Sequence, residues 1–371
     1  MFNYPIKLDK IFDKLIQNDA KPIIVGGYVR DAILQKNSQD IDIEVYNVAS
    51  FALLEDILKE FGTINSVGKS FGVCKLDFDE FKLDFTLPRK DSKISNGHTG
   101  FEIKVDSSLD YKTASSRRDF SINTIGYDIS SKTLLDPFNG IKDLKAKVLR
   151  VVDATKFGED PLRVLRAMQF CARFELVADK QLISICQNMC KDKLLDELAS
   201  ERIFEEFKKL LKSLKPSIGL TFLKQINALD FFYELNLEKK EWDVTLEVLD
   251  RCEKNITTQL ASLCYQMTEK NKDSFITKLT NQKQLVREIK QYHHIVDYVT
   301  NKSKTLKYSI IKDANLKNIS LFIVALGYKE KNLQYLKPLI HGKELVKVGF
   351  KPSKEFSNLL QLIYEIQLLH F

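Results

Sequence analysis

The 371-residue sequence has no long apolar run, and its 44% hydrophobic content is ordinary for a water-soluble chain. A membrane-spanning helix needs about 18 consecutive apolar residues, and no stretch approaches that length. Residues 1–20 have the apolar spacing of an amphipathic helix rather than the pattern of a signal peptide. There is also no internal repeat and no low-complexity linker. We therefore expect a cytoplasmic protein with no membrane partner.

The sequence also has few of the residues that build zinc sites and disulfide frameworks. Its six cysteines include no Cys-x-x-Cys pair, and only Cys186 and Cys190 fall on one helix face. No further Cys or His stands near that pair, so we interpret the cysteines as buried free thiols. The five histidines are scattered, and we interpret His293 and His294 as surface residues rather than ligands.

Arginine is scarce, at 11 of the 57 basic residues, and it is concentrated locally. Six arginines fall in a few short stretches, namely Arg30, Arg117, Arg118, Arg163, Arg166 and Arg173. Because guanidinium is a planar, bidentate donor, this local use predicts phosphate or carboxylate recognition. Residues 301–371 hold 12 Lys, no Arg and 5 acids. The net charge of this segment is therefore +7, which equals the net charge of the whole chain. This excess suits a phosphate backbone as partner, although a solvated lysine-rich surface alone would be the commoner explanation.

The hydrophobic periodicity divides the chain into a mixed N-terminal part and a helical remainder. Strands are predicted over 22–25, 40–45, 63–68, 72–78, 81–86, 101–105 and 133–135, and helices over 6–19, 28–36, 50–61 and 117–127. From about residue 150 onward the helical period dominates, with no clear strand. The predicted organisation is an α+β head over 1–150, a helical neck over 151–215, a helical body over 216–300 and a basic helical tail over 301–371.

The most informative pattern lies in the first two predicted strands. A β-branched run ends at Gly26 and Gly27, a short helical segment carries Arg30, and a second strand alternates Asp40 and Asp42 with isoleucine. Successive side chains of a strand point to opposite faces, so the two aspartates share one face. Paired carboxylates suit Mg²⁺, and glycines let backbone N–H groups approach a phosphate. The pattern predicts two-metal nucleotidyl transfer; a turn beside two surface acids is the alternative.

Asp84 is a third candidate carboxylate, because it lies between apolar residues in the predicted strand over 81–86. Beside Asp40 and Asp42 it would help hold a metal or orient a 3′-hydroxyl. A solubilising charge on an edge strand explains Asp84 about equally well.

Arg117 and Arg118 open the predicted helix over 117–127. They could bind phosphate or the ribose region. Asp119 could fix an arginine, and Asn123 lies one turn further along. An ion pair that caps the helix is the alternative.

Asp160 and Arg163 stand three residues apart in a predicted helix that continues through Arg166, Gln169 and Arg173. A carboxylate beside a guanidinium can imitate a base edge: the carboxylate accepts from an exocyclic amine and the guanidinium donates to a ring nitrogen. Cytosine and adenine fit this pattern, whereas uracil and guanine would leave both groups unpaired, which is costly. An intrahelical salt bridge is the commoner role of such a pair.

Taken together, these stretches resemble the bacterial class II tRNA nucleotidyltransferase (CCA-adding enzyme) and poly(A) polymerase family. The likeness covers roughly residues 20–210 and rests on VGGYVRD, DID, RRDFSIN, DPFNG, GEDPLRVLR and ERIFEEF. The stretch over 342–352 is also similar to the tail of CCA-adding members. The resemblance implies a polymerase-β-like head followed by an all-α neck, body and tail.

The resemblance also implies roles for individual residues. Asp40 and Asp42 would bind Mg²⁺; Gly27, Arg30 and Arg118 would contact the nucleotide; Asp160 and Arg163 would read the base edge, assisted by Arg166. With the residue-level arguments, the candidate catalytic set is Asp40, Asp42 and Asp84, and the candidate nucleotide-binding set is Gly26, Gly27, Arg30, Arg118, Asp160, Arg163, Arg166 and Gln169. The loop over 88–100 would be the mobile element linked to switching from C to A addition.

Two departures from the family pattern stand out. Gln169 occupies a position where many members carry arginine. Residues 241–270 faintly resemble an HD phosphohydrolase domain, but Tyr265 and Gln266 stand where its His-Asp pair would be, which implies that hydrolase activity is lost.

The function expected from the sequence is addition of C and A to the tRNA 3′ end from CTP and ATP, with Mg²⁺ as cofactor. A poly(A) polymerase, or an enzyme that adds only CC or only the terminal A, is the alternative within the same class. A non-enzymatic RNA-binding protein is the alternative of another class, and the intact Asp40 and Asp42 argue against it. The oligomeric state, monomer or homodimer, stays open.

Overall fold

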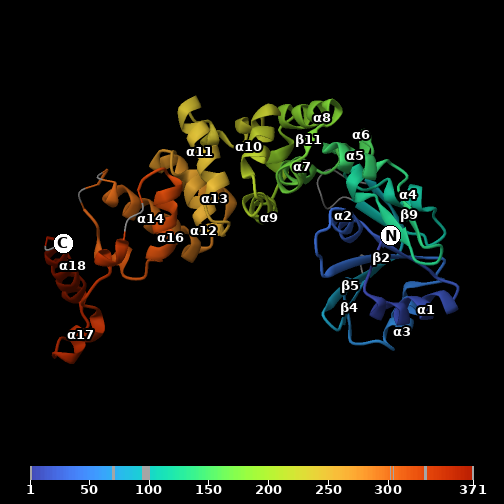
Figure 1. The fold of residues 1–371 in the computed structure, drawn as a ribbon, viewed down its shortest axis with the longest axis horizontal. Coiled ribbons are helices and arrows are strands. Elements are labelled where there is room, and N and C mark those ends of the chain that lie inside the picture. Colours follow the sequence, from blue (N-terminus) through green and yellow to red (C-terminus); the bar gives the residue numbers. More distant parts are fainter. Residues whose placement is uncertain are drawn as a thin grey trace. The chain divides into compact units, whose positions relative to one another are not determined.

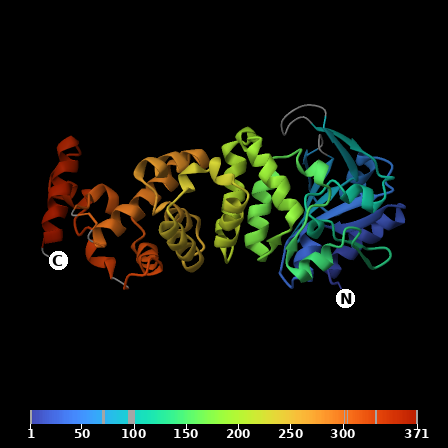
Figure 2. The same cartoon turned by 90° about the horizontal axis from the view of Figure 1, so that it is seen from above.

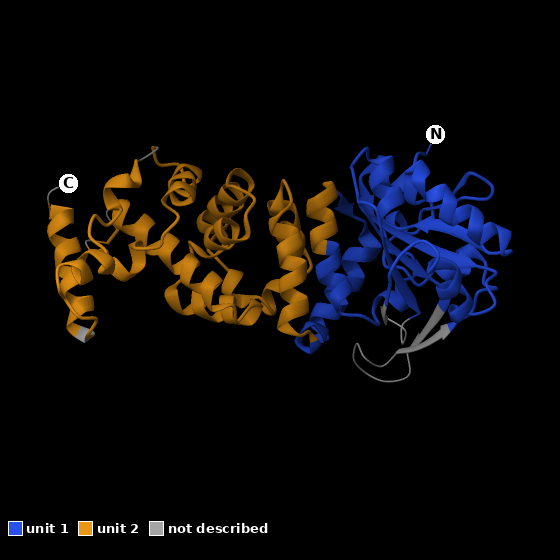
Figure 3. Cartoon of the chain, turned by 90° about the horizontal axis from the view of Figure 1, so that it is seen from below, with its two compact units in different colours: residues 1–167, 176–197 blue, residues 168–175, 198–371 orange. Residues whose placement is uncertain are grey.

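A computed structural model describes residues 2–68, 72–93, 101–300, 302, 303, 305–329 and 332–369. Its contacts divide the chain into two compact units, coloured separately in Figure 3. Unit 1 comprises residues 1–167 and 176–197, and unit 2 comprises residues 168–175 and 198–371. The division falls within one helix, α7 (Leu162–Phe174). The finer division into head, neck, body and tail stays a prediction.

Unit 1 is built on a seven-stranded sheet in the order β3-β4-β5-β2-β1-β8-β9 (Figure 1). Its strands are β1 (Lys21–Val25), β2 (Asp40–Tyr46), β3 (Ile64–Gly68), β4 (Val73–Phe78), β5 (Phe81–Thr86), β8 (Gly126–Asp128) and β9 (Thr133–Leu135). β2 and β5 run parallel and all other neighbours in the sheet run antiparallel. Two smaller pairings join β6 (Arg89–Lys93) to β7 (Phe101–Val105) and β10 (Val148–Leu149) to β11 (Val177–Ala178).

Helices bury apolar stripes in the core of unit 1. They are α1 (Asp9–Gln17), α2 (Gly27–Ile33), α3 (Phe51–Leu58), α4 (Tyr111–Ser115), α5 (Gly140–Ala146), α6 (Ala154–Phe157) and α8 (Lys180–Lys191). In the first turns of the chain the buried residues are Leu8, Ile11, Phe12 and Leu15, which is the i, i+3, i+4, i+7 spacing of one helix face. α1 packs this face against β1 and α3. The mixed sheet with a helical remainder confirms the predicted polymerase-β-like α+β fold.

The predicted helix over 117–127 is wrong. The segment instead holds a single 3-10 turn, η3 (Ser121–Asn123), followed by β8. Asp119 explains the break, because its carboxylate accepts a hydrogen bond from the backbone N–H of Phe120 at 2.9 Å. Phe120 then forms a β-bridge with Val151, thirty-one residues away. The expectation of no strand after residue 150 is also wrong, since β11 lies there.

Unit 2 consists of helices in its described residues (Figure 2). Besides the end of α7 they are α9 (Ser200–Leu211), α10 (Pro216–Gln225), α11 (Lys239–Arg251), α12 (Ile256–Cys264), α13 (Glu269–Leu279), α14 (Lys283–Val299), α15 (Tyr308–Ile311), α16 (Leu316–Ala325), α17 (Gly342–Lys347) and α18 (Lys354–Leu369). Short 3-10 turns complete the two units: η1 (Ile6–Leu8), η4 (Leu194–Glu197), η5 (Ala228–Asp230), η6 (Tyr233–Leu235) and η7 (Leu333–Leu336). Within the described ranges, every helix is too short or too polar to cross a bilayer.

The histidine prediction is half wrong. His294 is exposed, but His293 is buried, with its Nε2 atom 2.8 Å from the carbonyl oxygen of Ala261. Burial lowers the pKa of His293 to about 4, so the ring is neutral near pH 7. All six cysteines are free thiols, as predicted, and only Cys190 is partly accessible.

The position that departs from the HD pattern is occupied by an ordinary packed tyrosine. The hydroxyl of Tyr265 donates to Asp297 Oδ1 at 3.1 Å and accepts from Lys302 Nζ at 3.1 Å. The ring centroid of Tyr265 also lies 5.6 Å from that of His293, so side chains pack around Tyr265.

Candidate active site

Three aspartates lie on one face of the central strands. Asp40 and Asp42 are exposed, whereas Ile41 and Ile43 between and beyond them are buried, as the alternation predicts. In the parallel pairing of β2 with β5, Asp42 lies directly opposite Asp84. Opposed residues of neighbouring strands project from the same face. The structure therefore brings the three predicted carboxylates to one face of the sheet.

The electrostatics of this face favour a cation. Asp42 is open to solvent on one side, but the protein around it removes enough water to raise its pKa above the ordinary value. The positive charge of Arg118 opposes this shift, and the negative charges of Asp84 and Asp40 add to it. A hard divalent ion with oxygen ligands would relieve the repulsion among the carboxylates.

The donor set suits Mg²⁺ better than a metal that needs a closed cage. In the part of the chain that the structure describes, no three His, Cys, Asp or Glu side chains converge closely enough to form a preassembled metal site. Mg²⁺ usually takes only one or two protein carboxylates and completes its shell with water and substrate phosphates. Asp40 and Asp42 provide such a pair, on a rigid strand.

The turn between β1 and α2 requires a glycine at its first position. Gly26 has a φ of +68°, and its N–H donates to the carbonyl oxygen of Ile125 at 3.1 Å. A Cβ atom there would lie 2.7 Å from Nη1 of Arg118. At Gly27 the nearest atom would be Arg30 Nη2 at 3.6 Å, an ordinary contact. Gly26 thus lets Arg118 lie against the turn, and the role of Gly27 in nucleotide binding stays a prediction.

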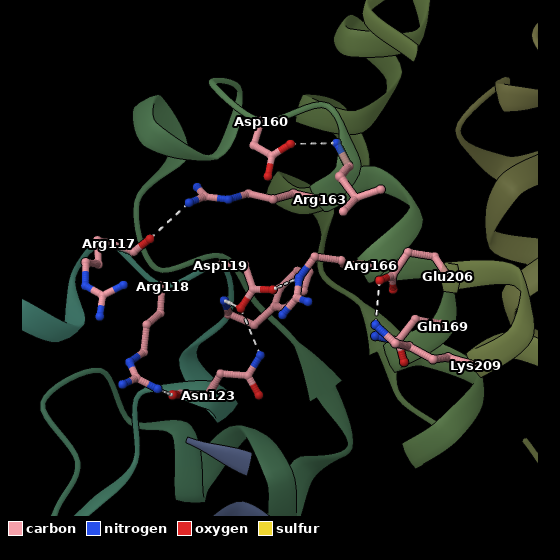
Figure 4. Close-up of polar contacts among 12 residues, drawn as sticks. Arg117, Arg118, Asp119, Asn123, Asp160, Arg163, Arg166, Gln169, Glu206 and Lys209 are labelled. Atoms are coloured by element: carbon pink, nitrogen blue, oxygen red, sulfur yellow. Dashed lines mark hydrogen bonds and ion pairs between the residues drawn. The ribbon is translucent and has the colours of Figure 1, made fainter. Parts of the chain in front are cut away.

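Arg30 belongs to a buried chain of polar contacts. It is 5% exposed; Nε donates to Asp31 Oδ1 at 2.8 Å and Nη1 donates to Asn123 Oδ1 at 2.6 Å. Asn123 Nδ2 in turn donates to Asp119 Oδ1 at 2.8 Å. Arg166 Nε donates to the other oxygen of Asp119 at 2.6 Å (Figure 4). The expectation that Asp119 fixes an arginine is confirmed, and contact of Arg30 or Arg166 with a nucleotide stays a prediction.

The network stabilises the ionised form of Asp119. Burial alone would raise the pKa of Asp119, but the nearby charge of Arg166 and the hydrogen bond from Asn123 hold it below the ordinary value. The network joins three segments, α2, the turn after Arg118 and the start of α7, so it fixes the predicted nucleotide-binding residues of unit 1 relative to one another.

A second buried network holds Arg117 and Arg118. Glu44 is 0% exposed, and its Oε1 lies 2.8 Å from Arg117 Nη2 and 3.3 Å from Arg118 Nη2. The hydroxyl of Tyr46 donates to Glu44 Oε2 at 2.9 Å. Burial would raise the pKa of Glu44, but the two arginines and this hydrogen bond hold it below the ordinary value. Sequence reasoning missed Glu44, although its signal is visible: it continues the in-phase series begun by Asp40 and Asp42.

Asp160 and Arg163 lie near each other, and both make hydrogen bonds with the backbone (Figure 4). Asp160 Oδ1 accepts from the N–H of Leu162 at 3.0 Å. Arg163 donates from Nη1 to the carbonyl oxygen of Lys156 at 2.8 Å and from Nη2 to that of Arg117 at 3.0 Å. The guanidinium is thereby held in a fixed position beside the Arg117 segment.

Gln169 lies in unit 2 and is 1% exposed. Its Oε1 accepts a long hydrogen bond of 3.4 Å from Arg173 Nη1. A nucleotide contact of Gln169 stays a prediction. The loop predicted to be mobile, 88–100, falls partly outside the described residues.

Comparison with known proteins places these observations in a family. Residues 23–150 match the family model of the poly A polymerase head domain, and residues 179–237 match the model described as the probable RNA and SrmB-binding site of polymerase A. Over these two stretches the chain is similar to the poly(A) polymerase and CCA-adding enzyme family. The head model spans the Gly26 turn, the three aspartates and Arg118, and so covers most of the candidate site in unit 1.

Curated relatives of this family match the N-terminal part of the chain. A multifunctional CCA protein of Stenotrophomonas maltophilia is 34% identical over 212 residues, covering 56% of this chain and 50% of its own length. A CCA-adding enzyme of Buchnera aphidicola is 35% identical over 221 residues, covering 58% of this chain and 50% of its own length. The chain thus aligns with about half the length of these relatives.

Solved structures of family members share the fold along almost the whole chain. An apo CCA-adding enzyme superposes with a TM-score of 0.74 at 20% identity, covering 99% of this chain and 93% of its own. The Thermotoga maritima CCA-adding enzyme complexed with tRNA superposes with a TM-score of 0.70 at 18% identity, covering 100% and 96%. At these identities the likeness establishes the fold.

Proposed function

We propose that the chain is a template-independent tRNA nucleotidyltransferase that adds C and A residues to tRNA 3′ ends from CTP and ATP. The observation that carries the proposal is the register of Asp42 opposite Asp84, with Asp40 on the same face and the Gly26 turn next to Arg118. The relatives named for CCA addition support the choice of reaction. The lysine-rich residues 301–371 would bind the tRNA body through its phosphates and shape, since duplex RNA is poorly read by sequence.

The residues of unit 1 divide the chemical work. Asp40 and Asp42 would hold Mg²⁺, which when bound activates the attacking 3′-hydroxyl and stabilises the pyrophosphate leaving group. Asp84 would orient the hydroxyl and help receive its proton. Arg118, fixed by Glu44 and the Gly26 turn, would place its positive charge at the phosphates. Pre-positioned charge of this kind needs no reorganisation during the reaction.

Base choice would rest on Asp160 and Arg163. Arg163 has five N–H donors, and two backbone carbonyls hold its guanidinium in place. A fixed donor beside a carboxylate fits the amine and ring nitrogen that cytosine and adenine share. Uracil and guanine would leave both groups unpaired.

The Asp160→Ala variant tests this assignment. We expect its preference for CTP over UTP to fall by about tenfold, because the acceptor for the exocyclic amine is gone. Asp153→Ala is the matched control: Asp153 also accepts backbone N–H bonds at the start of a helix, from Thr155 and Lys156. Both variants lose a cap worth about 1 kcal/mol, so only a selective change in nucleotide preference supports base reading. Equal preferences in the two variants would refute it.

The proposed reaction is tested with three tRNA transcripts, lacking CCA, ending in C, and ending in CC. Each is incubated with CTP alone, ATP alone and both, and the 3′ ends are sequenced. Completion of CCA on all three supports the proposal. Repeated A addition, also on unrelated RNA, would make the chain a poly(A) polymerase. Products that stop after CC, or that arise only from the CC transcript, would indicate a split-function enzyme.

A further inference from the structure

A lysine lies in the same row as two of the candidate carboxylates. In the antiparallel pairing of β4 with β5, Lys75 is directly opposite Asp84, which is itself opposite Asp42 on β2. The three side chains therefore project from one sheet face, in the order lysine, aspartate, aspartate. Lys75 Nζ lies 2.7 Å from Asp84 Oδ2, so the third carboxylate is already bound to a cation.

All three aspartates contribute to the pKa of Lys75. Its hydrogen bond with Asp84 raises the pKa of Lys75; burial opposes this shift, and the charges of Asp84, Asp42 and Asp40 add to it. The ammonium group is thus protonated and attracted by all three carboxylates. It supplies a positive charge next to Asp84 and Asp42 on this face.

A purely structural role explains this pair poorly. The Lys75 side chain is 56% exposed and that of Asp84 is 31% exposed, and exposed ion pairs contribute little to folding stability. β4 and β5 are already paired along their full length, from Val73 with Thr86 to Phe78 with Phe81. The ion pair matters more for the charge of the site than for joining the strands.

We propose that Lys75 is the resident counter-ion of the carboxylate cluster: it pairs with Asp84, and its positive charge opposes the entry of a divalent ion beside Asp42 and Asp40. This inference rests on the proposed function, because it takes Asp40 and Asp42 as the metal ligands. Lys75 is then a positioning residue that sets the divalent-ion affinity of the site. Its positive charge repels the metal ion.

Lys75 would keep the carboxylates ordered but lower the affinity of the site for the metal. With Lys75 in place, the carboxylates keep their geometry in the absence of metal, because one of the three repelling charges is neutralised. The same ammonium weakens metal binding until nucleotide phosphates bring further oxygen ligands. The site would then load its metal together with the nucleotide.

The test measures Mn²⁺ binding to the full chain without nucleotide, from the electron paramagnetic resonance signal of the free ion. We expect Lys75→Met to lower the Kd for Mn²⁺ by about tenfold, since one nearby positive charge is removed. Lys75→Arg, which keeps the charge, should bind as the wild type does. Lys14→Met is the matched control, because it removes a lysine that lies 2.9 Å from Glu60 elsewhere in unit 1; its Kd should not change.

The opposite results are equally clear. Unchanged or weaker Mn²⁺ binding by Lys75→Met, with Lys75→Arg folded and binding normally, overturns the counter-ion role. An unchanged Mn²⁺ affinity combined with a raised KM for CTP would instead place Lys75 at the substrate, and would also overturn it. Asp42→Ala separates this failure from failure of the proposed function. If Asp42→Ala keeps wild-type Mn²⁺ affinity, the metal lies elsewhere and both proposals are wrong.

Discussion

We expect Asp42→Ala to lower CMP incorporation into tRNA lacking its 3′ CCA by about 10³-fold. Asp42 lies at the centre of the carboxylate face, opposite Asp84 and two residues from Asp40. Without Asp42, Asp40 would be the one remaining carboxylate ligand of the metal on β2. Asp42→Asn keeps the size and one oxygen of the side chain, so a similar loss would identify the negative charge as the property that matters. Incorporation of labelled CMP, measured at saturating CTP and Mg²⁺, gives the rates.

Asp56→Ala is the control for Asp42→Ala. Asp56 is an exposed aspartate of α3 that is ion-paired with Lys59 at 2.7 Å, so its removal changes the net charge equally without touching the carboxylate face.

Asp42→Ala should also melt no lower than the wild type, because burial and like charges raise the pKa of Asp42 and make its ionised form unfavourable in the fold. Activity above a tenth of wild type would contradict a metal-ligand role.

The part of the site built on strands could be predicted from the sequence. Alternating side chains place Asp40 and Asp42 on one face, and the structure buries Ile41 and Ile43 on the other. This succeeds because the two-residue period of a strand fixes the face of every residue once a strand is assigned. The position of Asp84 needed more than periodicity, because the parallel register of β2 and β5 is a long-range property.

The turn that carries Arg117 and Arg118 could not be predicted by the same reasoning. Its sequence has helical spacing, but Asp119 binds the N–H of Phe120 and the guanidinium of Arg166. The N–H of Ser121 donates to the carbonyl oxygen of Arg150 at 3.0 Å. The contacts with Arg166 and Arg150 join residues about fifty and about thirty positions apart, and local propensity cannot anticipate them.

Asp160 and Arg163 show a different limit of sequence reasoning. Asp160 accepts a hydrogen bond from the N–H of Leu162, and Arg163 donates to two carbonyl oxygens, contacts that the spacing of the two residues does not specify. Spacing places two residues near each other on a helix but does not determine which partners they use. The backbone contacts still agree with a fixed, preorganised guanidinium.

Glu44 supports the second large prediction. It carries the charge that balances two partly buried arginines, Arg117 and Arg118, whose side chains are 20% and 17% exposed. We expect Glu44→Gln, which removes the charge but keeps the size, to destabilise unit 1 locally by about 3 kcal/mol, because an unpaired buried charge is costly. Arg118 would lose its anchor beside Gly26, so the KM for CTP should rise as well.

Amide hydrogen exchange measures this local destabilisation, because protection of β2 and of the turn after Arg118 reports the free energy of opening. Glu60→Gln is the control, since Glu60 pairs with Lys14 at 2.9 Å on the surface, where an ion pair contributes little. If Glu44→Gln and Glu60→Gln exchanged alike, Glu44 would not hold the arginines. If Glu44→Gln lost protection but kept the wild-type KM, Arg118 would not contact the nucleotide. The two measurements together therefore separate the structural contribution of Glu44 from its effect on nucleotide binding.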